Sequence, residues 1–181
     1  MTMPRFVALL RGVNVGAAKR VPMAELRALL ATLGHTEVAT LLNSGNAVFA
    51  SSGRSQAGLA GRIRGAIAEM LGVDVPVIVK SAQEVAAIVA ANPFVGQATD
   101  PSRLLVAFTP DRASLQGLNA VSAWVKPPEQ LHVGDHAAYL WCPDGVLKSA
   151  AGEALLGKPG RQATTRNWAT VLKISTLLIP V

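Results

Sequence analysis

Basic side chains and glycines gather in one short stretch near the start of the chain, residues 11–20. The stretch follows an apolar run and precedes an amphipathic pattern, so we expect a loop between a buried strand and a helix. Backbone N–H groups at such a junction can surround an anion. The alternative is a plain connection whose charges are solvated. The candidate ligand-binding residues here are Arg11, Gly12, Asn14, Gly16 and Lys19.

The spacing of the glycines in this stretch limits the chemistry that it can indicate. It matches neither the GxGxxG pattern nor a Walker A sequence. Both of those patterns place glycines where a nucleotide phosphate must approach the backbone. The loop therefore predicts an anion site without predicting a nucleotide.

A second polar stretch, residues 43–46, separates two short strand-like runs. Its sequence, Asn-Ser-Gly-Asn, is typical of a hairpin turn, because Asn and Gly tolerate the positive φ that such turns need. The alternative is a ligand-binding role, because amide and hydroxyl groups at a hairpin tip can hydrogen-bond to a ligand. The candidate residues for that role are Asn43, Ser44 and Asn46.

A third candidate region lies near the C-terminus, at residues 164–168. We expect Thr165 to cap a final helix, which places Arg166 in the first turn, where the helix dipole disfavours a cation. A bound anion would offset that cost. The alternative is an ion pair between Arg166 and an acidic residue such as Asp135 or Asp144. The candidate ligand-binding residues are Lys148, Thr165, Arg166 and Asn167.

Arrangements suited to catalysis or metal binding are sparse. His132 and His136 flank Asp135 on an expected hairpin, a weak basis for a metal site. Cys142 ends an expected strand, and we expect a buried, unreactive thiol. Ser44 lies outside a Gly-x-Ser-x-Gly sequence, so no hydrolase nucleophile is predicted. The sequence assigns no catalytic residue, no metal and no cofactor.

The apolar periodicity predicts the elements that must position these residues. Residues 1–80 read as strand, helix, strand, strand, helix and strand, the ferredoxin-like βαββαβ order. We expect the loop at 11–20 and the turn at 43–46 to lie at opposite ends of this sheet. The expected strands are 6–10, 38–42, 47–50 and 75–79, and the expected second helix is 56–71.

Residues 81–181 are expected to form a second α+β subdomain packed on the first. Ser81 and Glu84 have the spacing of a capping box, which predicts a helix. A βαββ pattern and a C-terminal helix follow, although no sequence repeat is evident. The predicted fold class is therefore α+β, with a ferredoxin-like first half.

Composition and charge restrict the function further. The chain has 181 residues, half of them apolar, and 17 basic against 11 acidic residues give a net charge of +6. The excess lies in residues 1–80 and 145–181, whose meeting would create a positive face. No apolar run approaches the roughly 20 residues of a membrane span, so no membrane partner is expected. The single cysteine and the absence of a signal-peptide pattern predict the cytoplasm.

Longer motifs resemble an uncharacterised bacterial domain-of-unknown-function family. They are LRGVNVG at 10–16, VPMAELR at 21–27, NSGN at 43–46 and TTRNW at 164–168. The resemblance implies an α+β fold with ferredoxin-like elements, and it implies no established substrate or catalytic residue. The family commonly has a Ser-Lys pair after its Pro-Asp-Gly loop, whereas this chain has Lys148 followed by Ser149.

These observations predict a cytoplasmic protein that binds an anionic ligand, either nucleic acid or a phosphate-containing small molecule, at a basic face. One alternative is an enzyme acting on a phosphorylated or carboxylated small molecule, with Arg166 and Lys148 as clamps. Another is a protein-interaction or assembly module, and the sequence gives no oligomeric state. The main hypothesis includes a version in which the three candidate regions share one positive cleft. The residues that would face one another across it are Arg11, Asn14, Lys19, Asn43, Asn46 and Arg166.

Overall fold

The computed structural model describes residues 2–53 and 55–180. The chain divides into two compact units, which we call unit 1 and unit 2. Unit 1 is Met1–Val85 with Ile174–Val181, and unit 2 is Ala86–Lys173. The return of the C-terminal residues to unit 1 is not visible in the sequence pattern.

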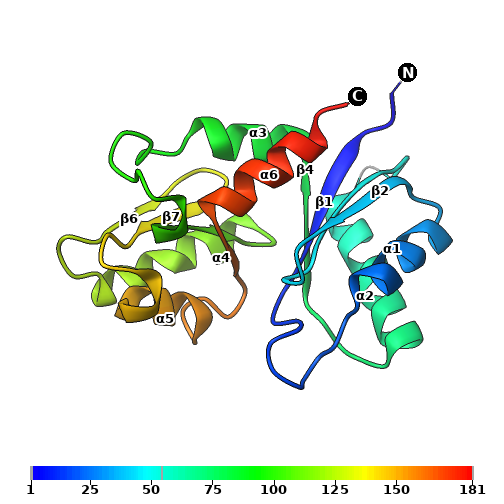
Figure 1. Ribbon diagram of the computed structural model, residues 1–181, viewed down its shortest axis with the longest axis horizontal. Helices are drawn as coiled ribbons and strands as arrows, with labels where there is room; N and C mark the ends of the chain where they lie inside the picture. The colour runs from blue at the N-terminus through cyan, green and yellow to red at the C-terminus, as the bar shows by residue number, and fades with distance from the viewer. Residues whose placement is uncertain (1, 54, 181) are drawn as a thin grey trace. The chain divides into compact units, whose positions relative to one another are not determined.

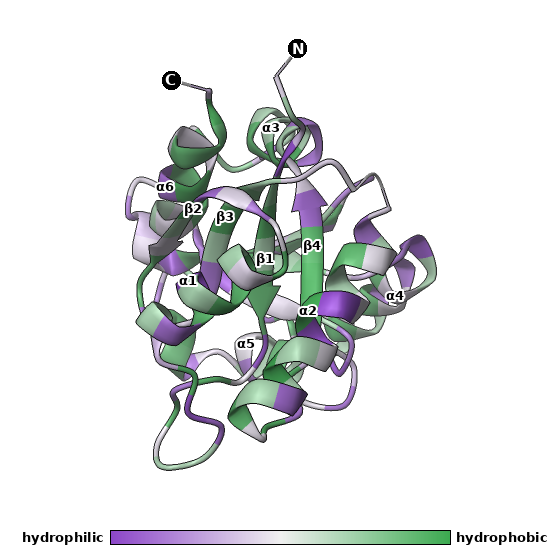
Figure 2. Ribbon diagram, turned by 90° about the vertical axis from the view of Figure 1, so that its right-hand side faces the viewer, coloured by the Kyte–Doolittle hydropathy of each residue, from purple (hydrophilic) through white to green (hydrophobic). Residues whose placement is uncertain are grey.

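Unit 1 contains a four-stranded antiparallel sheet in the order β2-β3-β1-β4. The helices α1 (Met23–Thr32) and α2 (Gln56–Leu71) cover one face of it (Figures 1 and 2). This is the predicted ferredoxin-like βαββαβ arrangement. Its strands are β1 (Arg5–Leu10), β2 (Thr36–Leu41), β3 (Asn46–Ala50) and β4 (Val77–Ser81).

The helix α2 shows how local sequence sets the elements of unit 1. It begins after Ser55, whose hydroxyl accepts a hydrogen bond from Gly58 N, and it ends at Gly72, in the left-handed region at φ +69°. Its buried stripe is Leu59, Ile63 and Ile67. Burial of each such aliphatic side chain stabilises the folded state by about 1.5–3 kcal/mol. The expectation that Met70 continues the stripe is wrong, because its side chain is 55% exposed.

Unit 2 contains a second four-stranded antiparallel sheet, in the order β6-β7-β5-β8. Between its strands lie α4 (Arg112–Gly117) with the 3-10 helix η2 (Leu118–Trp124), and α5 (Ala150–Leu156). Short 3-10 turns occupy Pro101–Arg103 and Val146–Lys148. The topology is therefore again βαββαβ, strand for strand as in unit 1. The strands are β5 (Leu104–Phe108), β6 (Gln130–Val133), β7 (Ala138–Trp141) and β8 (Thr164–Asn167).

A further helix follows the fourth strand of each sheet. The first, α3 (Ala82–Ala90), begins with the predicted capping box, since Ser81 Oγ accepts from Glu84 N and Glu84 Oε2 accepts from Ser81 N. The second, α6 (Trp168–Leu178), is capped by Asn167, whose side-chain oxygen accepts from the backbone N–H of the third helical residue. The expectation that Thr165 caps this helix is wrong, because Thr165 pairs with β5 as part of β8. Within the described ranges, no helix is long and apolar enough to cross a membrane.

Candidate functional site

Three connections meet at one end of the unit 1 sheet. Because β1 is antiparallel to both β3 and β4, Leu9 pairs with Asn46 and Leu10 pairs with Val77. The end of β1 therefore lies beside the starts of β3 and β4. The expectation that the 11–20 loop and the 43–46 turn lie at opposite ends is wrong for this reason. We call this region the loop end; it comprises residues 11–22, 42–45 and 72–76.

Asn14 joins two of these connections. Its Nδ2 donates to Val21 O at 2.9 Å and to Asn43 O at 2.7 Å. Its Oδ1 accepts from Val21 N at 2.9 Å. The side chain thus closes the base of the long loop and ties it to the hairpin turn. We assign Asn14 a positioning role, because its amide groups bond to backbone.

The turn at 42–45 is held in the same way. Asn46 is 1% exposed, and its Nδ2 donates to Leu41 O and Ser44 Oγ, both at 2.9 Å. Gly45 has φ +88°, and a Cβ there would lie 2.6 Å from Leu10 Cβ. Only glycine lets the turn approach β1 this closely. Ser44, Gly45 and Asn46 therefore stabilise the turn itself.

The long β1–α1 loop, dark blue in Figure 1, extends beyond the sheet. It forms a small hairpin in which Val15 pairs with Ala18 and Asn14 N donates to Lys19 O at 3.1 Å. Apart from each glycine and its two chain neighbours, no atom of the described residues lies within 4 Å of the position that a Cβ would take at the exposed residues Gly12 and Gly16. A ligand could therefore approach this backbone directly. Four residues of the loop have positive φ: Gly12, Asn14, Gly16 and Lys19.

The charges at the loop end are mainly positive. Lys19 and Arg20 are exposed, and Arg11 is half-buried. Asp74 is the only acidic residue in the three connections, and its carboxylate accepts two hydrogen bonds from Arg64, at 2.6 and 2.8 Å. These bonds, and then the charges of Arg64 and Lys19, lower the pKa of Asp74 below its ordinary value. The carboxylate of Asp74 is thus paired with Arg64. The cations of the long loop therefore give the loop end an excess of positive charge.

The third candidate region belongs to unit 2. Arg166 lies in β8, is 6% exposed, and donates from NH1 to Thr164 Oγ1 and Thr165 O, both at 2.8 Å. Burial lowers the pKa of Arg166 to about 10. The expectation that Arg166 lies in the first turn of the final helix is wrong, because Arg166 belongs to β8 and precedes the helix. Thr165 is half-buried, Asn167 caps α6, and Lys148 is exposed.

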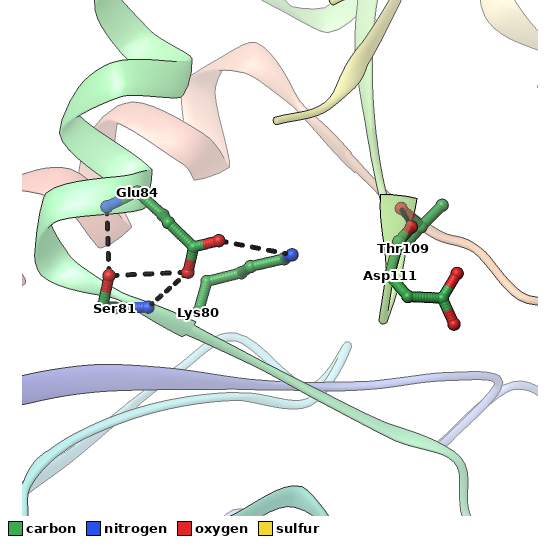
Figure 3. Close-up of polar contacts among 5 residues, drawn as sticks. All are labelled: Lys80, Ser81, Glu84, Thr109 and Asp111. Atoms are coloured by element: carbon green, nitrogen blue, oxygen red, sulfur yellow. Dashed lines mark hydrogen bonds and ion pairs between the residues drawn. The ribbon is translucent and has the colours of Figure 1, made fainter. Parts of the chain in front are cut away.

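A buried ion pair at the end of β4 is absent from the sequence-based candidates. Lys80 Nζ lies 3.7 Å from Glu84 Oε1, and the two side chains are 8% and 23% exposed (Figure 3). In Figure 2 this end of β4 is hydrophilic, in contrast to the rest of the strand. A lysine within the apolar strand sequence VIVKS is the signal that could have indicated it. Glu84 offsets the lysine charge, and we assign the pair a structural role.

The other residues considered for catalysis or metal binding receive no support from the structure. Cys142 is buried, as expected, and burial raises the pKa of its thiol, which disfavours the reactive thiolate. Within residues 2–53 and 55–180, no three His, Cys, Asp or Glu side chains group closely enough to hold a metal ion.

Two units of one topology, one of them bearing a long basic loop, define an α+β protein with two four-stranded antiparallel sheets. The chain belongs to the family described as Protein of unknown function (DUF1697), whose model matches residues 3–139. It is also similar to the solved structure of the conserved bacterial protein SP0830 from Streptococcus pneumoniae. That match has 29% identity and a TM-score of 0.82, and it covers 98% of this chain and 99% of the other. A search of curated proteins finds no match.

Proposed function

We propose that this protein binds a phosphate-bearing ligand, a small molecule or a nucleic-acid strand, at the loop end of unit 1. The exposed cations Lys19 and Arg20 attract the anion, and Arg11 adds charge at the base of the loop. The exposed backbone around Gly12 and Gly16 contacts it through N–H groups. Asn14, Asn43, Ser44 and Asn46 hold the loop and turn in place.

The length of the β1–α1 loop is the observation that carries this proposal. It spans twelve residues, 11–22, whereas the equivalent β5–α4 connection of unit 2 spans three, 109–111. The short connection suffices for the same topology, since Asp111 caps α4 directly. Ordering the additional residues costs conformational entropy, and long ordered loops in compact domains commonly carry function.

The backbone of the long loop supports the same conclusion. Lys19 has φ +50°, a left-handed conformation that costs a non-glycine residue about 1–2 kcal/mol. Local strain of this kind concentrates at functional sites. A lysine held in this conformation beside exposed glycines is consistent with a built anion site.

The enzyme alternative receives less support. It relies on Arg166 and Lys148 as clamps, and Arg166 is buried in β8. We therefore propose binding without assigning a reaction. The assembly alternative is tested by light scattering, which measures the oligomeric state directly. A cytoplasmic location stays a prediction.

The test is fluorescence anisotropy with short single-stranded DNA, duplex DNA and RNA, from about 50 to about 300 mM salt. Nucleic-acid binding should weaken steeply with salt. Lys19→Ala and Arg20→Ala should each weaken it and lower the salt slope by about one. The matched control is Arg62→Ala, which removes one exposed charge of unit 1 on α2.

A thermal-shift series with ATP, sugar phosphates and inorganic phosphate distinguishes the two ligand sizes. A small ligand should raise the melting temperature of the wild type and of Arg62→Ala, but not of Lys19→Ala. If Arg62→Ala lost the ligand-induced rise in melting temperature as fully as Lys19→Ala, net charge rather than this loop would govern binding. If neither nucleic acid nor phosphate compounds bind at low salt, the proposal is wrong.

A further inference from the structure

A cavity of about 350 Å³ lies in unit 2, between α3 and the β6–β7 hairpin. Small-molecule sites usually occupy about 300–1,000 Å³, so the volume suits a small ligand. Ala87 and Ala91 line it on the α3 side. Polar side chains line it on the hairpin side: His132, Asp135, His136 and Tyr139.

The apolar walls of the cavity arise from small residues and one fixed aromatic ring. Ala87 and Ala91 are four positions apart, which puts two methyl groups on the same side of the chain and leaves space beside them. Tyr139 is 1% exposed, and its hydroxyl donates to Ile88 O at 2.6 Å. Its ring stacks against His132, with 6.1 Å between centroids. Tyr139 is therefore fixed in place, with its ring closed off from solvent.

The hairpin turn places the polar groups at the cavity. Gly134 N donates to Ala137 O at 2.9 Å, which closes a tight turn. A Cβ on Gly134 would lie 3.2 Å from Ala137 O and 3.4 Å from the Tyr139 ring, so this turn is closely packed. Asp135 and His136 lie within the turn, and both are exposed residues of the cavity lining.

The chemistry of this lining differs from that of the loop end. It offers one carboxylate and two imidazoles, and none of its described residues is Lys or Arg. A carboxylate attracts positive charge, and imidazole nitrogens form hydrogen bonds with polar groups of a ligand. The cavity therefore disfavours phosphate and favours a donor-rich cation.

We propose that this cavity binds a small organic amine with a planar or short apolar body. The ammonium group pairs with Asp135, and the apolar body lies against the methyl groups of Ala87 and Ala91. The inference is independent of the anion site proposed for unit 1, since every residue that carries it belongs to unit 2.

Three aryl probes of similar size and different charge test this chemistry: benzylamine, benzyl alcohol and benzoate. In a ¹H–¹⁵N NMR titration of the full chain, benzylamine should shift the amide signals of residues 132–139 and saturate. Benzyl alcohol should bind about fivefold more weakly, the factor expected from losing an exposed ion pair. Benzoate should cause no saturable shift there. The proposal is wrong if benzoate binds as tightly as benzylamine, or if benzylamine causes no shifts in this segment.

Two pairs of variants locate the site. Asp135→Asn should weaken benzylamine about fivefold without changing benzyl alcohol, and Asp144→Asn, at an exposed residue outside the lining, should change neither. Ala87→Leu should fill the cavity and remove binding of both, whereas Ala90→Leu, exposed on the same helix, should not. Unchanged benzylamine binding in Asp135→Asn overturns the proposal even if Ala87→Leu fails to fold.

Discussion

His35 is a buried group whose protonation opposes folding. The residue is 5% exposed, and its ring lies 4.6 Å from the Phe49 ring, centroid to centroid. Within the described residues its Nε2 is buried without a hydrogen-bond partner. Loss of solvent, and then the charge of Arg62, lower the pKa of His35 below its ordinary value of 6.5. The neutral ring is therefore the folded form.

This lowered pKa predicts acid sensitivity. As pH falls below about 6.5, the unfolded chain binds a proton at His35 that the folded chain does not, so stability decreases. Urea unfolding should show a constant midpoint above about pH 7.5 and a falling midpoint toward about pH 5.5. His35→Leu should flatten that decline, whereas His136→Asn, at an exposed position, should not. An unchanged slope in His35→Leu would contradict the prediction.

We expect Arg166 to contribute to the stability of the folded chain. Arg166→Ala removes a buried side chain and takes the NH1 donor away from Thr164 Oγ1 and Thr165 O. We expect a loss of about 2 kcal/mol in the free energy of unfolding, measured with urea. Arg161→Ala, at an exposed position of the same unit, should cost less than about 0.5 kcal/mol. Equal effects of the two substitutions would argue against this role.

At the scale of elements, the junction of β4 and α3 combines a helix cap with an ion pair. Glu84→Gln keeps a side-chain acceptor for Ser81 N but leaves the buried ammonium of Lys80 without its counter-charge. We expect a loss of about 1–3 kcal/mol. Lys80→Met should cost less, because it removes the charge that needs a partner.

The double variant isolates the pair itself. Lys80→Met with Glu84→Gln should recover most of the loss caused by Glu84→Gln alone, with a coupling energy above about 0.5 kcal/mol. Urea unfolding of the four proteins measures this coupling. Strict additivity would show that the two side chains do not interact energetically.

Elements of one topology also carry different loops in the two units. β1 and β5 hold equivalent places in their sheets, yet the loop after β1 is four times as long as the one after β5. The shared topology explains the sheets, and it does not explain the long loop. This difference, rather than the fold itself, directs the functional proposal to unit 1.

At the scale of the whole molecule, the chain ends in unit 1 after passing through unit 2. Arg5 on β1 donates to Leu177 O at 3.0 Å and pairs with Glu37 at 2.6 Å. The last part of α6 is thereby tied to the first strand. The C-terminal residues should therefore contribute to the stability of unit 1.

Substitutions in α6 test this contribution. Leu178 is 3% exposed, and Leu178→Ala should cost about 2–5 kcal/mol. Leu172, on the same helix, is 40% exposed, and Leu172→Ala should cost far less. Hydrogen exchange should show faster exchange in β1 for Leu178→Ala. Protection of β1 equal to that of the wild type would show that the C-terminus does not support unit 1.

The sequence by itself determined the features that depend on neighbouring residues. The limits of α2, with Ser55 before it and Gly72 after it, follow from a cap, a periodic stripe and a left-handed glycine. The capping box of α3 and the βαββαβ order of unit 1 follow from equally local signals. The family also followed from the sequence, because its motifs are continuous segments.

Only the tertiary structure decided the features that depend on distant partners. The polar segment Thr164–Asn167 becomes β8 because β5 supplies its hydrogen bonds, and no periodic pattern marks it. The loop at 11–22 meets the turn at 42–45 because β3 runs antiparallel to β1. The cavity of unit 2 exists because Ala87 of α3 lies beside the hairpin. Strand direction and packing join residues far apart in sequence, so they are set by the folded chain as a whole.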